Sequence, residues 1–149
     1  MRLVTPVTAP SQARMAPVAE REKRSVLRRG SVPLFAHGLA EYGEGLLTIL
    51  APFLFGYDGS TGATLLSIVI GASVLVLAVV TDTRTGISRT LPLPAHVVLD
   101  YVLVVVYLAS PFIFGFSDVN RALGYFLVIG IAHLLMTVTT RFRPNDRHG

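Results

Sequence analysis

The sequence contains the same pattern twice, at positions 59 residues apart. Residues 31–56 (SVPLFAHGLAEYGEGLLTILAPFLFG) align without a gap on residues 90–115 (TLPLPAHVVLDYVLVVVYLASPFIFG). The shared pattern is S/T-x-P-L-x-A-H-x-x-x-D/E-Y, then an apolar run, then A/S-P-F-x-F-G-Y/F, and the register continues to Arg84 and Arg143. About seventeen of roughly fifty-four aligned positions are identical, so we expect a duplicated structural unit.

The apolar content of the chain predicts a membrane protein. Hydrophobic residues make up 52% of the sequence, charged residues make up 15%, and the mean hydropathy is +0.60. Four apolar segments are each about twenty residues long, the length that crosses a hydrocarbon core of roughly 30 Å. We expect an all-α membrane protein in which four transmembrane helices form two tandem two-helix hairpins, at about 33–55, 63–81, 92–114 and 119–140.

Local signals predict where these helices begin and end. Ser31 and Thr90 are the expected N-caps, each followed by a proline in the first helical turn. Pro52 should either kink the first helix or end it at Gly56. The second helix has small residues at every fourth position, which lets another helix approach closely; they are Ala63, Ser67 and Gly71.

The thirteen Lys and Arg residues predict the orientation of the chain. All except Arg121 lie in the N-terminal tail, in the linker between the hairpins or near the C-terminus. The positive-inside rule then places both termini in the cytoplasm and makes the chain a multi-pass protein of the cell membrane. Both hairpins insert the same way up, so a pseudo-two-fold axis along the membrane normal should relate them. The expected divisions are a disordered basic tail (1–30), a first repeat (31–84), a linker (85–89), a second repeat (90–143) and a short tail (144–149).

The motif that closes the first helix of each repeat resembles that of a known family. The segments A-P-F-L-F-G-Y and S-P-F-I-F-G-F resemble the Ser-Pro-Trp motif of the bacterial SPW-repeat membrane proteins, although Phe replaces its Trp in both copies. The motif residues are Pro52, Phe53, Phe55 and Gly56 in the first copy, and Ser110, Pro111, Phe112, Phe114 and Gly115 in the second. The resemblance covers nearly all of the chain after Gly30. It implies an integral membrane protein of two-span repeats, and it implies no catalytic residues.

Polar side chains recur on one face of the first helix of each repeat. Four of them in the first copy lie within about 60° of one another around the helix axis, which makes a single stripe. The stripe residues are His37, Glu41, Glu44 and Thr48, and in the second copy His96, Asp100, Tyr107 and Ser110. An aspartate in the middle of a membrane costs roughly 2.5–3.5 kcal/mol, so these side chains should face the interior of the bundle.

Three interpretations of the stripe remain open. The histidines and carboxylates could be structural, as interfacial anchors or as hydrogen bonds between helices worth about 1 kcal/mol each, with Tyr42 and Tyr101 in the aromatic belt. The stripe could instead conduct protons or ions along Glu41, Glu44 and Thr48, in an oligomer. A pseudo-two-fold axis would also bring together two imidazoles and two carboxylates, a ligand set for Zn, Mn or Fe; these are His37, His96, Glu41 and Asp100.

Two polar residues have no counterpart in the other repeat. Glu44 aligns with Leu103, and His133 aligns with Val74. If one carboxylate is functional and not inherited scaffolding, Glu44 is the best candidate. We expect His133 to be a packing residue, although it is a further candidate axial ligand of haem beside the paired histidines.

Enzymatic motifs are missing from the sequence. We find no hydrolase, kinase or nucleotide-binding signature, and the absence of cysteine excludes disulfides and thiolate chemistry. We therefore predict no enzyme, no catalytic residue and no cofactor. The expected function is that of a structural or accessory membrane protein, which contacts lipid, associates with itself or with a larger membrane complex, and binds no nucleic acid. The alternative is an ion- or proton-conducting oligomer that uses the intramembrane carboxylates.

Overall fold

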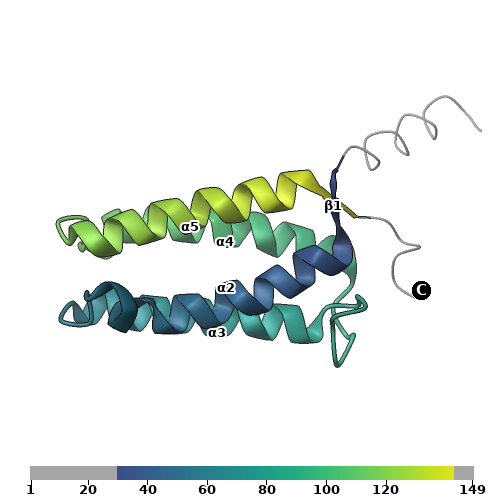
Figure 1. The fold of residues 1–149 in the computed structure, drawn as a ribbon, viewed down its shortest axis with the longest axis horizontal. Coiled ribbons are helices and arrows are strands. Elements are labelled where there is room, and N and C mark those ends of the chain that lie inside the picture. Colours follow the sequence, from purple (N-terminus) through teal and green to yellow (C-terminus); the bar gives the residue numbers. More distant parts are fainter. Residues whose placement is uncertain (1–29, 143–149) are drawn as a thin grey trace, which may run out of the picture.

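The computed structural model describes residues 30–142, and the tails expected before Gly30 and at 144–149 lie outside them. Four long helices run side by side in the described part (Figure 1). They are α2 (Leu34–Phe55), α3 (Thr61–Val80), α4 (Leu93–Ile113) and α5 (Asn120–Thr139). The expected all-α architecture is thus confirmed, and each helix lies where the apolar segments predict it.

The helices form two hairpins, α2 with α3 and α4 with α5, and contacts within each hairpin are much more extensive than contacts between them. The two tight turns lie at one end of the bundle, here called the turn end (Figure 1). The α3–α4 linker lies at the opposite end, with both ends of the described chain. There the two-residue strands β1 (Val32–Pro33) and β2 (Thr140–Arg141) pair in parallel, which ties the start of the first hairpin to the end of the second.

The helix starts differ from the expected caps. Neither Ser31 nor Thr90 caps a helix, because the N-cap positions are Pro33 and Pro92, which are extended and make no side-chain capping bond. A proline there holds φ near −65° and leaves the next residue free to begin the helix, so no side-chain cap defines the boundary. The C-terminal expectation is confirmed, since α2 ends at Gly56 with a positive φ of 66°.

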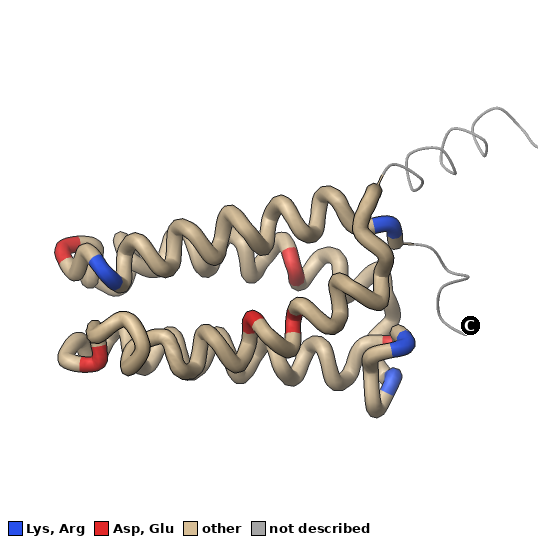
Figure 2. The backbone as a smooth tube through the Cα atoms, viewed as in Figure 1, with Lys and Arg blue, Asp and Glu red and all other residues tan. Residues whose placement is uncertain are grey.

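Three of the four helices, α3, α4 and α5, are long and apolar enough to cross a membrane. Large apolar side chains on the outside of the bundle are exposed, among them Phe53 and Phe112 of the repeated motif. Basic positions gather at the linker end, whereas Arg121 is the basic residue of the described chain at the turn end (Figure 2). The exposed apolar side chains and the gathering of basic residues at one end both agree with what is expected of a membrane protein.

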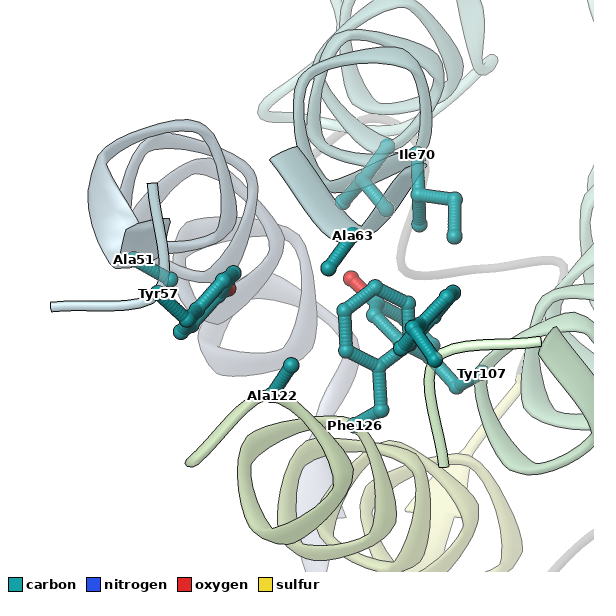
Figure 3. Packing of buried hydrophobic residues seen from close by; sticks show 9 residues of the cluster. Ala51, Tyr57, Ala63, Ile70, Tyr107, Ala122 and Phe126 are labelled. Atoms are coloured by element: carbon teal, nitrogen blue, oxygen red, sulfur yellow. The ribbon is translucent and has the colours of Figure 1, made fainter. Parts of the chain in front are cut away.

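The interior of the bundle has an apolar half and a polar half. The apolar half lies toward the turns, where Tyr107 and Phe126 pack among small residues such as Ala63 and Ala122 (Figure 3). The polar half lies toward the linker and contains the buried histidines and carboxylates of the predicted stripe.

The small-residue face of α3 is buried inside the bundle. Gly71 packs so closely on α2 that a Cβ atom there would lie 2.6 Å from the carbonyl oxygen of Gly45. Ala63 and Ser67 on the same face are buried too. The expected close helix approach is therefore present, but this face is not available for contacts with a partner protein.

Candidate metal centre

Four buried side chains meet between α2 and α4. His37 and Glu41 lie one helical turn apart on α2, and His96 and Asp100 lie one turn apart on α4. Side chains at i and i+4 share one face of a helix, so both members of each pair point toward the facing helix. None of the four is more than 2% exposed. We call these residues the tetrad.

The ligand atoms of the tetrad are close to one another. The two histidine Nε2 atoms are 3.4 Å apart. The Glu41 Oε1 atom lies 3.6 Å from Nε2 of His37 and 3.3 Å from Nε2 of His96. The Asp100 carboxylate places Oδ2 3.4 Å from Nε2 of His37 and Oδ1 3.4 Å from Nε2 of His96. One ligand atom from every member lies within 4.8 Å of the others.

Two threonines orient the imidazoles. The hydroxyl of Thr81 donates its proton to the carbonyl of Leu77, at 2.6 Å, and lies 2.8 Å from Nδ1 of His96. The hydroxyl of Thr140 donates in the same way to Met136 and lies 2.9 Å from Nδ1 of His37. Because each hydroxyl proton is already used, Nδ1–H must be the donor to the threonine oxygen. A neutral imidazole held in this way directs the Nε2 lone pair into the tetrad.

The carboxylates of the tetrad lack hydrogen-bond donors. Among the described residues, Glu41 Oε1 and both carboxylate oxygens of Asp100 are buried and accept no hydrogen bond. Buried oxygens of this kind are costly unless a proton or a cation satisfies them. The tetrad therefore has lone pairs directed inward from both imidazoles and both carboxylates, and a cation would satisfy all of them.

The two residues that have no counterpart in the other repeat contact each other beside the tetrad. Glu44 places its carboxylate oxygens 2.9 and 3.0 Å from Nδ1 of His133, which is fully buried on α5. The Nε2 atom of His133 lies 3.9 Å from Oδ1 of Asp100. His133 thus has the same orientation as the tetrad histidines, with Nδ1 on an oxygen acceptor and Nε2 toward the carboxylate, and the packing role expected of it stays a prediction.

The rest of the predicted stripe forms a hydroxyl network further along α2. Thr48 Oγ1 lies 3.0 Å from the hydroxyl of Tyr107 and 2.8 Å from that of Tyr125. Ser110 bonds back to the carbonyl of Val106 in its own helix. At the turn end, burial raises the pKa of Tyr57 to about 12, and its hydroxyl lies 2.9 Å from Ser67 Oγ. These hydroxyls bond to one another or, for Ser110, to the backbone, and none of these bonds involves the tetrad.

Sequence reasoning singled out every member of the tetrad but not the threonines that orient it. Thr81 and Thr140 occupy aligned positions of the two repeats and are identical. This identity is the sequence feature that could have pointed to them. The tyrosines expected in an aromatic belt differ from each other: Tyr42 donates to the carbonyl of Thr85 at 3.0 Å, whereas Tyr101 is 45% exposed.

Comparison with protein-family models, with curated proteins and with solved structures found no match. The resemblance to the SPW-repeat proteins consequently stays a prediction from the motif.

Proposed function

We propose that the tetrad binds one divalent transition-metal ion, and that the chain is a small non-enzymatic membrane protein built around this ion. The distances between ligand atoms support the proposal most strongly. Ligands about 2.0–2.1 Å from a tetrahedral zinc ion are about 3.3–3.4 Å from one another. The three distances among Nε2 of His37, Nε2 of His96 and Oε1 of Glu41 range from 3.3 to 3.6 Å, and Asp100 places a different oxygen 3.4 Å from each of the two nitrogen atoms.

The same distances argue against protons in place of the metal. Charge-assisted N–H to carboxylate hydrogen bonds are shorter, at about 2.7–2.9 Å. Two protonated imidazoles with Nε2 atoms 3.4 Å apart would also repel each other in a buried site. A divalent ion has neither difficulty, because it attracts all four ligand atoms and balances the charge of two carboxylates.

The ligand set favours zinc, with Mn²⁺ and Fe²⁺ as the other ions that two imidazoles and two carboxylates accept. A single ion fits better than haem. Axial ligands lie on opposite sides of a macrocycle, whereas Nε2 of His37 and Nε2 of His96 are 3.4 Å apart with carboxylates beside them. We therefore propose a metal where the sequence alone predicts no cofactor.

The proposed ion has a structural role because it joins the two hairpins. Each hairpin supplies one histidine and one carboxylate, and contacts between the hairpins are less extensive than contacts within them. Neutralised carboxylates would also allow α2, which carries Glu41 and Glu44, to cross the membrane as a fourth span. In this proposal two two-span repeats are related by an axis along the membrane normal, both termini are cytoplasmic, and the exposed motif residues serve contacts with lipid or another membrane protein.

Proton conduction is the second candidate function. One observation favours it, since polar groups continue from Glu44 along α2 to the hydroxyls of Thr48, Tyr107 and Tyr125. The apolar packing around Tyr107 argues against a water-filled path within one chain. A conducting form would therefore require an oligomer, and the Glu44→Gln variant would then abolish proton flux in proteoliposomes without removing metal.

The test of the metal proposal is elemental analysis and a visible spectrum of the protein purified in mild detergent without chelator. We expect about one zinc, manganese or iron ion per chain and its loss in the His37→Ala/His96→Ala variant. The control is His133→Ala, which removes a third buried imidazole and should keep the metal. Because variants can misfold, the wild-type chain is also stripped with EDTA and titrated with Co²⁺, which should give the visible bands of a tetrahedral site. A Soret band, or a stripped chain that binds neither Co²⁺ nor Zn²⁺, would overturn the proposal.

A further inference from the structure

An open groove lies on the outside of the bundle, where α2 and α5 meet near the turn end. Its volume is about 520 Å³, within the range of about 300–1,000 Å³ that is usual for ligand sites. The walls are apolar and include Leu47 and Phe55 from α2 with Val128 and Ile129 from α5. The groove belongs to the seam between the two hairpins and is separate from the tetrad.

A glycine stands in the lining of this groove where the other repeat has a large residue. Gly124 lies in its lining, and the aligned residue of the first repeat is Leu65, which is 58% exposed. A Cβ atom added at Gly124 would meet no atom within 4 Å, so glycine is not required there by packing. A side chain at residue 124 would therefore extend into open space in the groove.

A positive charge stands at the end of the same groove. Arg121 is exposed, lines the groove, and aligns with Gly62 of the first repeat. Its Nη1 atom donates long bonds to the carbonyls of Phe55 and Gly56, at 3.5 and 3.3 Å, which leaves its other N–H groups for an anion. Asp58 and Asp118 lie in the two turns, and neither forms an ion pair with Arg121 within the described residues.

We propose that this groove binds an anionic phospholipid, with an acyl chain along the apolar walls and the headgroup phosphate at Arg121. The occupant follows from the combination of an apolar channel with a guanidinium at its end, since guanidinium binds phosphate through paired N–H groups. The lipid is the partner of matching chemistry, because the surrounding helix surface is apolar and exposed. The proposal rests on insertion into a membrane and not on the metal, so either can fail without the other.

The test is a lipid titration of the purified full chain in detergent micelles, read by native mass spectrometry. The two probes are phosphatidylglycerol and phosphatidylcholine, which differ in net charge. We expect one phosphatidylglycerol to be retained, with an affinity that falls about ten- to hundredfold in Arg121→Gln. Gly124→Leu, which copies the first repeat, should abolish retention of the lipid while the melting temperature without lipid does not fall.

The matched control is Gly43→Leu on α2. A Cβ at Gly43 also meets nothing within 4 Å, and Gly43 does not line the groove, so this variant has the same change in size and helix propensity. It should retain phosphatidylglycerol as the wild type does. Equal affinity for both lipids, or retention that survives Gly124→Leu, would overturn the proposal. Loss in Gly124→Leu with no effect of Arg121→Gln would overturn recognition of the anionic headgroup.

Discussion

At the scale of single residues, two threonines behind the tetrad determine which nitrogen atom of each histidine faces the site. Thr81 and Thr140 each accept Nδ1–H from a histidine of the other hairpin, which fixes Nε2 as the ligand atom. Partners of this kind usually change metal affinity by about 10–100-fold. We expect Thr81→Val and Thr140→Val each to weaken Zn²⁺ binding by about this factor, measured by competition with a chromophoric chelator.

The control for these variants is Thr139→Val. Thr139 precedes Thr140, is exposed, and bonds only to carbonyls of its own helix. The same change of hydroxyl to methyl should leave Zn²⁺ affinity unaltered there. If Thr81→Val and Thr140→Val fold normally and bind Zn²⁺ as tightly as the wild type, the threonines do not orient the ligands.

The residues of the tetrad could be predicted from the sequence, and their surroundings could not. His37 and Glu41 share a helix face at spacing four, which is a local rule, and the repeat predicts His96 and Asp100 in the same way. The contact of Glu44 with His133 joins residues 89 apart on different helices. No periodicity within one helix encodes such a contact, because it depends on how α5 packs against α2.

At the scale of elements, the close approach of α2 and α3 depends on glycines. A Cβ at Gly71 would lie 2.6 Å from the Gly45 carbonyl oxygen and 2.8 Å from Cγ1 of Ile49. Backbone cannot yield as a flexible side chain does, so Gly71→Ala should force the helices apart. We expect a loss of stability of about 1–3 kcal/mol, measured by thermal or denaturant unfolding in detergent.

Gly43 provides the comparison for this prediction, because it lies on the same hairpin with open space around its Cα atom. Gly43→Ala should stabilise the protein by up to about 1 kcal/mol through helix propensity. Equal effects of the two alanines would show that propensity, and not close packing, determines the outcome at Gly71.

The helices themselves were predictable because their length and apolarity suffice to locate them. Their starts were not, since Ser31 and Thr90 fit the preferences for capping residues but stand outside the helices. The prolines at 33 and 92 mark the boundaries instead. At these two helix starts the fixed φ angle of proline determines the boundary, although the residue types favour N-caps at Ser31 and Thr90.

At the scale of the whole molecule, the tetrad and the β1–β2 pair both join the two hairpins near the linker end. The turn end is joined by the apolar cluster around Tyr107 and Phe126. The bundle therefore holds its halves together at both ends by different means. Only the connection through the tetrad would depend on a metal, so metal binding would affect the linker end most.

The orientation of the bundle gives the last prediction. The chain contains no native cysteine, so single cysteines can report on which side of the membrane a position lies. Ser31, Gly59 and Ser88 are exposed and lie before α2, in its turn to α3, and in the linker. We expect a membrane-impermeant maleimide to label Gly59→Cys in intact cells, and Ser31→Cys and Ser88→Cys only after the membrane is permeabilised.

The three sites distinguish the ways in which this topology could fail. Gly59→Cys and Ser88→Cys must differ if α3 crosses the membrane, as its length and composition allow. Ser31→Cys reports on α2, the polar helix that carries two residues of the tetrad. Labelling of both Ser31→Cys and Gly59→Cys in intact cells would mean that α2 does not cross, and the tetrad would then have to form without the membrane-spanning geometry proposed for it.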